Sequence, residues 1–275
     1  MRGLRRAAPG LSLAGKIIIG VLLISPVILG LSFSFMGPSE RAEIPPHITP
    51  REPVIGNYAA AVRSVPVFRF ILNSLLVCAL VILGQVFTCS FGAYAFSFFT
   101  FPGRRFLFLV VLSTMMIPAD AIIIANYLTI SRLRLNDTYT AMVAPYLSSA
   151  MGIFLMRQFF LTIPRELREA ALIDGCGDLR FLFRVALPIS KPAIASLGVY
   201  IFIQVYNQFL WPLLVTNTNR MRTVQVGISI LKEAEITDYG VVLAGSVLIL
   251  IPAVFVFIIG QKYLVKGMTA GAVKG

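Results

Sequence analysis

The stretch from Pro164 to Pro188 reads P-R-E-L-R-E-A-A-L-I-D-G-C-G-D-L-R-F-L-F-R-V-A-L-P. Pro164 suits the first position of a helix, where a backbone N–H has no intrahelical partner to lose. Glu166 and Glu169 follow early, where the helix dipole favours negative charge. Gly175 can adopt a positive φ, which commonly ends a helix. The stretch therefore predicts a short helix that ends in a turn at Gly175.

A second short helix is expected after this turn, from about residue 178 to residue 186. Pro188 and Pro192 should then interrupt the chain, because proline lacks a backbone donor. The segment from about residue 162 to residue 192 would thus form a helix–turn–helix elbow. On composition alone, an amphipathic linker lying at a membrane surface accounts for this loop equally well.

The chain around the elbow is too apolar for a soluble domain. Apolar residues make up 57% of the 275 residues and charged residues 13%, against about 45–50% and about 25% in soluble proteins. The mean hydropathy is +0.85. Disordered chains are poor in apolar residues, so disorder is excluded as well. The composition indicates an integral membrane protein.

Six apolar stretches are long enough to cross a membrane, since a helix needs ~20 residues to span a hydrocarbon core of ~30 Å. The first is too long for a cleaved signal peptide, and no small-residue cleavage site follows it closely. We therefore expect an all-α integral membrane protein with six transmembrane helices in one domain over residues 1–275. The expected spans are about 13–35, 70–98, 106–130, 138–161, 193–215 and 240–261.

The distribution of basic residues predicts the orientation. Of the 24 Lys and Arg residues, fifteen fall on the side of the two termini and the elbow, and nine on the other side. Cytoplasmic loops carry the excess of Lys and Arg, so both termini and the elbow are expected in the cytoplasm. The net charge of +12 is explained in this way, and no nucleic-acid partner is expected because no long basic run is present.

Residue types that carry metal or acid–base chemistry are scarce. His47 is the only histidine, and the cysteines Cys78, Cys89 and Cys176 form no C-x-x-C pair. Such a set predicts neither a metal site nor catalysis by histidine. No catalytic residue is therefore expected.

The run E-A-A-L-I-D-G at Glu169–Gly175, with Pro188 thirteen residues after Gly175, resembles the E-A-A loop of ATP-binding-cassette importer permeases. Two positions depart from the usual form of that motif. Cys176 stands where alanine is common, and Leu182 stands where phenylalanine is usual. Neither departure removes the helix or the turn.

Further motifs resemble the carbohydrate-uptake branch of that family, which includes maltose and glycerol-3-phosphate permeases. These are N-S-L at 73–75, F-P-G-R-R at 101–105, Y-N-Q-F-L-W-P-L-L at 206–214 and G-M-T-A-G-A-V-K-G at 267–275. Within the branch, R-Q-F-F-L-T-I-P-R-E-L at 157–167 looks most like the glycerol-3-phosphate permease subunits. Sugar and oligosaccharide permeases share much of this pattern and stay open as the alternative.

The resemblance implies a type I importer permease fold in a bacterial plasma (inner) membrane. It implies a second, homologous permease subunit, two cytosolic ATPase subunits and an extracytoplasmic substrate-binding protein as partners, besides membrane lipid. This chain has no G-x-x-x-x-G-K-[ST] phosphate loop. It is therefore expected to be no enzyme and to bind no cofactor, and ATP and Mg would bind the ATPase partners.

By the same resemblance, the elbow is the loop that couples the permease to its ATPase. Small side chains at Ala170 and Ala171 would allow close approach. Glu169 and Asp174 would serve as polar contacts or caps, and Gly175 would supply the turn that precedes Pro188.

Polar residues within the spans are candidates for a translocation path or gate. Asp120 lies in the outer half of the third span, where an acid normally faces a cavity or a partner, so either a gate or a structural pair is expected. Four uncharged residues would line a path for polyols or hydrogen-bond between helices, namely Asn126, Gln204, Asn207 and Gln208. Trp211 lies near the outer boundary, where tryptophan commonly anchors.

Two other classes of membrane protein fit this sequence less well. A membrane-embedded enzyme such as a lipid transferase would need clustered acids, histidine or a metal motif near the interface, whereas Asp120 is the one acid within a span. An ion-coupled transporter would be expected to show internal repeats or paired broken helices, and it would leave the elbow unexplained.

Overall fold

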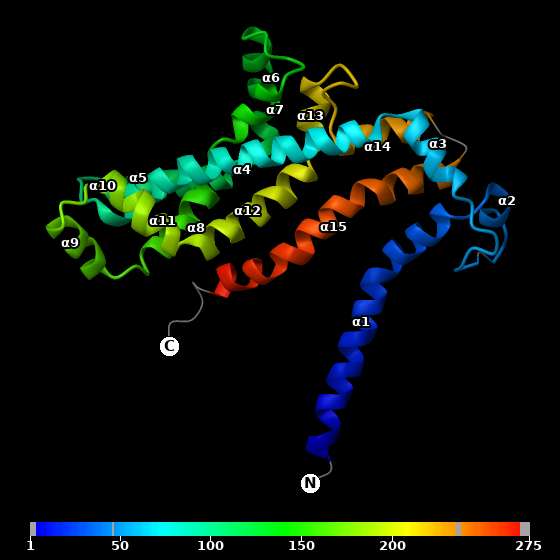
Figure 1. The fold of residues 1–275 in the computed structure, drawn as a ribbon, viewed down its shortest axis with the longest axis horizontal. Helices are drawn as coiled ribbons and strands as arrows, with labels where there is room; N and C mark the ends of the chain where they lie inside the picture. The colour runs from blue at the N-terminus through cyan, green and yellow to red at the C-terminus, as the bar shows by residue number, and fades with distance from the viewer. Residues whose placement is uncertain (1–3, 46, 235–237, 270–275) are drawn as a thin grey trace. The chain divides into compact units, whose positions relative to one another are not determined.

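The computed structural model describes residues 4–45, 47–234 and 238–269, and every regular element among them is a helix (Figure 1). The chain forms two compact units. Unit 1 comprises residues 1–67 and 228–250, and unit 2 comprises residues 68–227 and 251–275. The expected all-α fold is confirmed.

Three continuous helices among the described residues are long and apolar enough to cross a membrane. They are Gly15–Ser34 within α1 (Leu4–Ser34), α4 (Val67–Phe98), and Tyr239–Tyr263 within α15 (Tyr239–Thr269). They match the expected first, second and sixth spans. Each is an unbroken apolar run of at least ~20 residues, which is what a membrane-spanning helix requires.

The expected third and fourth spans are bent rather than continuous, and a third bend joins the elbow to α12 (Lys191–Tyr206), just before the expected fifth span. Arg104–Met116 and Ala119–Arg132 meet at 91°, Tyr139–Tyr146 and Ala150–Phe160 at 52°, and Asp178–Ile189 and Lys191–Tyr206 at 77°. Counting each bent pair as one span gives up to six spans. The expected number is therefore reached, but the third, fourth and fifth stretches are not straight helices.

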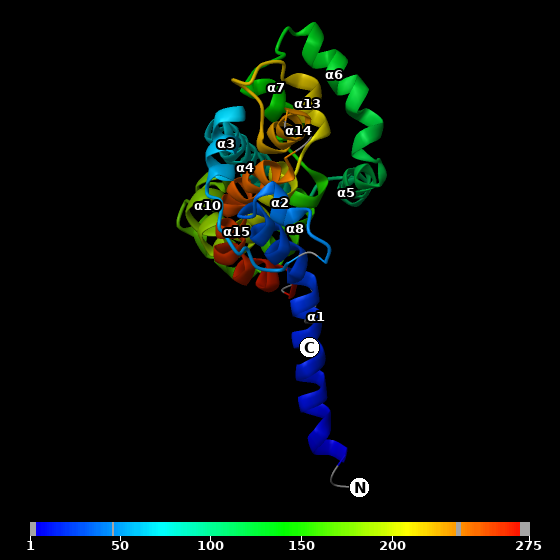
Figure 2. The same ribbon diagram turned by 90° about the vertical axis from the view of Figure 1, so that its right-hand side faces the viewer.

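The first bend has a clear local cause at Pro118. Proline disfavours helical backbone at the residue before it, and Ile117 is extended, with φ −81° and ψ 117°. α5 (Arg104–Ser113) and the 3₁₀ turn η1 (Thr114–Met116) therefore end here. The turn η2 (Ala119–Ile122) and α6 (Ile123–Arg132) leave in a new direction, as Figure 2 shows.

The expected fifth span, 193–215, is divided. α12 (Lys191–Tyr206) ends at Tyr206, and a separate helix α13 (Leu210–Val215) follows. Proline is tolerated in the first turn of a helix but not in its interior, so Pro212 fits a helix that begins at Leu210. The expected continuous helix is wrong at this point, and residues 207–209 lie between two helices.

Unit 1 holds the segment after α1, with α2 (Pro38–Arg41) and α3 (Gly56–Ser64). The Asn57 amide donates to the carbonyl oxygens of Ser34 and Met36 at 2.8 and 3.0 Å. Arg41 forms an ion pair with Asp238, which lies just before α15. These contacts hold the segment to both membrane-length helices of this unit.

Unit 2 is organised around α4, which packs beside α8 (Ala150–Phe160) and α12 (Figure 1). At mid-length the Gln85 amide, only 7% exposed, donates to the Tyr146 carbonyl at 2.8 Å and accepts from the Ser149 hydroxyl at 2.7 Å. Both partners flank the bend of the fourth span, between η3 (Ala144–Tyr146) and α8. The Tyr146 carbonyl freed by the bend is thus satisfied by α4, as buried polar groups require.

Candidate functional site

The elbow begins with α9 (Arg165–Ile173). Pro164 has an extended ψ of 137° and immediately precedes the helix, so it is not the first helical residue that we expected. Gly175 has a φ of +71°, as its place in the sequence predicts. Gly175 N–H donates to the Leu172 carbonyl at 3.0 Å, and Cys176 N–H donates to the Ala171 carbonyl at 2.8 Å. This pair of bonds is a Schellman motif, which satisfies the free carbonyls at a helix end.

The second half of the elbow is longer than expected. α10 (Asp178–Phe181) continues through a π-helical turn, η4 (Leu182–Ala186), into α11 (Leu187–Ile189). Pro188 therefore lies inside the helix, and the break falls at Ser190. Within a regular helix the ring of Pro188 would clash with the carbonyl of Arg184. The wider π-helical turn contains Arg184, which explains why the helix continues past the point where we expected it to stop.

α9 contributes no side chain to the core of the chain. Glu169, Ala170, Asp174, Gly175 and Pro188 are exposed, and Ala171 is half-buried. Apolar side chains beside them are open as well, with Leu172 50%, Ile173 87% and Leu179 63% exposed. A polar and apolar face left open in this way is typical of an interaction surface.

The elbow is fastened to the C-terminal end of α4 by three side chains, which we call the latch: Tyr94, Arg168 and Asp178. The Asp178 carboxylate accepts from the Arg168 guanidinium at 3.0 Å and from the Tyr94 hydroxyl at 2.8 Å. Arg168 also donates to the Phe98 carbonyl at 3.2 Å. The hydrogen bonds from Arg168 and Tyr94 lower the pKa of Asp178 below its usual value, so the latch stays ionised at neutral pH.

Sequence reasoning did not find the latch, because its members lie in three different elements. Arg168 and Asp178 stand on opposite sides of the Gly175 turn, and Tyr94 belongs to α4. Opposite charges on either side of a tight turn were the one available signal. The turn brings them together by reversing the chain between them.

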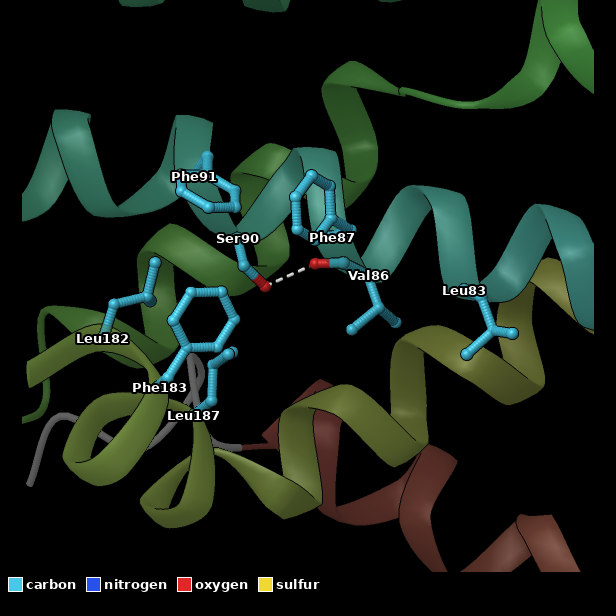
Figure 3. Close-up of a pocket in the computed structure, with 8 residues that line it drawn as sticks. All are labelled: Leu83, Val86, Phe87, Ser90, Phe91, Leu182, Phe183 and Leu187. Atoms are coloured by element: carbon cyan, nitrogen blue, oxygen red, sulfur yellow. Dashed lines mark hydrogen bonds between the residues drawn. The ribbon is translucent and has the colours of Figure 1, made fainter. Parts of the chain in front are cut away.

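An apolar cavity of about 200 Å³ lies beside the elbow, between α4 and the π-helical turn (Figure 3). The Ser90 hydroxyl donates to the Val86 carbonyl at 2.5 Å, so it offers no free donor. None of the predicted site residues lines this cavity, and its apolar wall does not suit a polar substrate. The lining residues are Leu83, Val86, Phe87, Ser90, Phe91, Leu182, Phe183 and Leu187.

The structure brings two predicted path residues together around Tyr146. The Gln208 side chain and the Asp120 carboxylate both lie near enough to the Tyr146 hydroxyl to influence it. The rings of Tyr146 and Trp211 pack edge to face with centroids 6.3 Å apart. Asp120, Tyr146 and Gln208 lie at or beside three interruptions of helix. Non-helical backbone at membrane depth is tolerated where it is buried in protein or lines a cavity.

The remaining path candidates are placed differently. Asn207 is exposed, donates to the Ile203 carbonyl at 2.8 Å and accepts from the Gln225 amide at 3.4 Å. Gln204 is exposed and Asn126 is half-buried. Trp211 is 3% exposed and donates its indole N–H to the Ala141 carbonyl at 3.2 Å. Its polar group is therefore occupied within the chain.

Sequence reasoning missed Tyr146 and also Gln225, the hydrogen-bond partner of Asn207. Tyr146 follows Pro145 in the fourth apolar stretch, and a proline beside a polar aromatic residue was the signal for it. Gln225 lies outside every expected span, so hydropathy gave no reason to place it near Asn207.

Asp137 joins two loops of unit 2. Its carboxylate accepts from the N–H groups of Asn217 and Thr218 at 2.9 and 3.1 Å, and from the Thr218 hydroxyl at 2.7 Å. Burial raises the pKa of Asp137, but the hydrogen bonds from Thr218 and Asn217 outweigh it and the pKa is lowered. The carboxylate therefore holds the loop after α13 against the turn before α7 (Tyr139–Val143).

Asp137→Ala is expected to lower the melting temperature of the purified protein by about 2–4 °C, because it removes about 1 kcal/mol of net hydrogen bonding. The folded-state pKa lies below the usual value of 3.8. The stabilisation is therefore complete above pH ~4 and is lost as pH falls through the folded pKa. Thermal unfolding of wild type and variant at pH 7, 5, 4 and 3 measures this. A difference between them that grows as pH falls would contradict it.

The family model of binding-protein-dependent transport system inner membrane components matches residues 51–270. The sn-glycerol-3-phosphate transport system permease protein UgpE of Brucella abortus (strain 2308) is 35% identical over 262 residues, with 92% of this chain and 93% of that protein covered. UgpE of Rhizobium meliloti (strain 1021) is 36% identical over 264 residues, with the same coverage.

Two further likenesses bear on the fold and on the alternative substrate. The arabinooligosaccharides transport system permease protein AraQ of Halalkalibacterium halodurans is 37% identical over 196 residues, covering 71% of this chain and 70% of that protein. A crystal structure of a bacterial ABC transporter involved in the import of the acidic polysaccharide alginate contains a chain with a TM-score of 0.83 and 23% identity. The alignment covers 94% of this chain and 96% of that one. This likeness confirms the expected type I importer permease fold.

Proposed function

Because this chain belongs to the family of binding-protein-dependent transport system inner membrane components, we propose that it forms half of the translocation path of an ATP-driven importer for glycerol-3-phosphate or a glycerophosphodiester. The observation that carries the substrate class is the similarity to two UgpE permeases over 92% of the chain. The shorter similarity to AraQ makes an oligosaccharide importer the second candidate. The family is one of transport components, so the chain is not an enzyme.

The proposed partners follow from the family. A second, homologous permease completes the path, two cytosolic ATPase subunits bind ATP and Mg, and an extracytoplasmic binding protein delivers the substrate. We place the ATPase contact on the exposed face of α9, with Glu169, Ala170, Ala171, Asp174 and Gly175 as its centre. This face is open in the isolated chain and combines polar and apolar side chains, as a docking surface requires.

We place the path at the polar group around Tyr146, with Asp120, Gln208 and Asn207. Uncharged hydrogen-bonding side chains suit the hydroxyl groups of a polyol. A carboxylate repels a phosphoester, so Asp120 fits a gate or a structural role better than a contact to phosphate. Gln204 and Asn126 are placed at the edge of this path, and Trp211 supports it by packing on Tyr146. Residues 1–275 act together as one permease domain in this proposal.

Uptake into vesicles tests the substrate class. Proteoliposomes that contain the complete complex, external binding protein and internal ATP should accumulate radiolabelled sn-glycerol 3-phosphate, and unlabelled arabino-oligosaccharide should not compete. A non-hydrolysable ATP analogue serves as the matched control. Accumulation of arabino-oligosaccharide in place of sn-glycerol 3-phosphate would favour the second candidate. ATP-dependent uptake of neither would reject both substrate classes.

The proposed orientation places both termini and the elbow in the cytoplasm. Cys176 is the accessible native thiol of the elbow, while Cys78 and Cys89 are buried. A membrane-impermeant maleimide added to intact cells should therefore spare Cys176 and label a Glu52→Cys variant, since Glu52 is exposed in the opposite loop. Permeabilised cells provide the control, in which Cys176 should react. Labelling of Cys176 in sealed cells would reverse the orientation.

A further inference from the structure

The outer end of α4 is fixed to the loop that follows α13. The Asn73 amide, 1% exposed, donates to the carbonyls of Arg220 and Arg222 at 3.0 and 2.9 Å and accepts from the Tyr139 hydroxyl at 2.7 Å. One residue further on, the Ser74 hydroxyl accepts from Val224 N–H at 2.9 Å. Two adjacent side chains of α4 thus hold both ends of the segment 220–224.

The inner end of α4 is fixed to the elbow by the latch. Tyr94 bonds Asp178 directly, and Arg168 joins Asp178 to the Phe98 carbonyl at the end of α4. The buried Phe181 ring packs against Phe98 with centroids 5.6 Å apart. The elbow therefore has polar and apolar attachments to the last turns of α4. Any displacement of α9 would be transmitted to that end of the helix.

The two attachment points are separated by about one membrane thickness. Asn73 and Tyr94 are 21 residues apart in the same helix, which is about 32 Å at 1.5 Å per residue, against a hydrocarbon core of ~30 Å. The sequence of α4 contains no proline, so no hydrogen bond of its backbone is lost to a kink.

The bent spans of unit 2 are poor candidates for the same task. The third and fourth spans contain bends of 91° and 52°, and the fifth follows a bend of 77° and is divided at residues 207–209. At each break, a push along one half is not passed along the axis of the other. α4 is also bonded at mid-length through Gln85 to the bend that carries Tyr146. It therefore contacts the elbow, the polar group and the outer loop in turn.

We propose that α4 is a strut that couples the elbow to the outer loop 217–223, with Tyr94, Arg168 and Asp178 as positioning residues at its inner end and Asn73 at its outer end. This inference rests on the proposed function, in which a binding protein acts outside and ATPases act inside. The apolar cavity between α4 and the π-helical turn (Figure 3) leaves that side of the elbow loosely packed. The latch and the Phe98–Phe181 contact thus form the firm connection.

The first test compares isosteric variants in the complete reconstituted complex. Tyr94→Phe removes one hydroxyl of the latch, and Asn73→Asp removes both donors to the outer loop. Ser97→Ala is the matched control, because the Ser97 hydroxyl donates only to the Ala93 carbonyl within α4. The measurement is ATP turnover with and without binding protein loaded with sn-glycerol 3-phosphate.

Each of the two variants should assemble normally, keep the basal turnover and lose about fivefold or more of the stimulation by loaded binding protein, which is the size of a typical coupling between distant sites. The double variant should be no worse than the more severe single variant, since both interrupt one route. The proposal would be overturned if either single variant kept the wild-type stimulation of ATP turnover. It would also be overturned if the losses of stimulation in the two single variants multiplied in the double variant.

The second test does not depend on the substrate. A spin label at Asn217→Cys, with Cys176→Ser to remove the accessible thiol, reports on the outer loop. Addition of Mg-ATP to the complex should change its mobility in the wild-type background, and Tyr94→Phe should abolish the change. An equal response in both backgrounds, or none in the wild type, contradicts the strut. If the wild-type complex responds to Mg-ATP in the second test but binding protein loaded with sn-glycerol 3-phosphate does not stimulate its ATP turnover in the first, the proposed substrate is rejected and the strut is not.

Discussion

Gly175→Val is expected to give a chain that inserts into the membrane at normal levels but whose complex neither retains its ATPase nor transports. Gly175 has a φ of +71°, a conformation that costs a β-branched residue about 1–3 kcal/mol. An added Cβ would meet nothing within 4 Å, so the cost arises from the backbone and not from crowding. Relaxation of the turn would break the Schellman bonds and misalign α9 with α10.

Gly177→Ala is the matched control, because Gly177 lies two residues away with a φ of −67° and open space around its Cα. Ala170→Leu adds bulk on the exposed face without touching the turn, and overpacking a close contact costs about 1–3 kcal/mol. That corresponds to roughly 5- to 150-fold weaker association with the ATPase. Ala170→Ser should be close to wild type.

Pull-down of the ATPase, ATP turnover and uptake in vesicles measure these outcomes together. If Gly175→Val and Ala170→Leu both match the wild type in all three, the elbow is a linker at the membrane surface and the proposed ATPase contact is wrong. If Gly177→Ala fails as severely as Gly175→Val, the positive φ is not the cause.

The second large effect is expected at the path. The double variant Asn207→Ala and Gln208→Ala should lower uptake about tenfold or more, because each neutral hydrogen bond lost to a substrate costs about 0.5–1.5 kcal/mol. Assembly should survive, since interhelical hydrogen bonds in membranes average only ~0.6 kcal/mol. Tyr146→Phe, which removes the hydroxyl on which Gln208 acts, should show part of the same loss.

Thr129→Ala is the control for this prediction, because the Thr129 hydroxyl donates to the Ala125 carbonyl within its own helix. Initial uptake rates at several substrate concentrations, with the amount of assembled complex as reference, measure the effect. Normal rates in the double variant would assign Asn207 and Gln208 to packing between elements rather than to the path.

The sequence predicted most accurately where one physical signal acts alone. Continuous apolar runs predicted α1, α4 and α15, because length and hydropathy suffice for a straight span. Gly175 predicted its turn, because few other residues accept a positive φ. The bends at Pro118 and at 207–209 were missed, since hydropathy averages over a window and does not record where the backbone leaves a helix.

The contacts between elements were beyond sequence reasoning. Arg168 and Asp178 are ordinary surface charges until the Gly175 turn and Tyr94 bring them together. Likewise, Asp120, Gln208 and Tyr146 share no local motif, and each lies at or beside a separate interruption of helix. The residue types were visible in the sequence, but their geometry depends on tertiary packing.

The π-helical turn at 182–186 explains why the spacing of thirteen residues between Gly175 and Pro188 should be fixed. A π-helical turn holds one residue more than an α-helical turn, so deletion of one residue there would restore a regular helix. Every position after it would then rotate by about 100° and move by about 1.5 Å, and the ring of Pro188 would meet an intact helical turn. Natural variation should therefore tolerate substitution in this segment far more readily than a change in its length. Homologues should keep the number of residues between Gly175 and Pro188 even where the residue types differ.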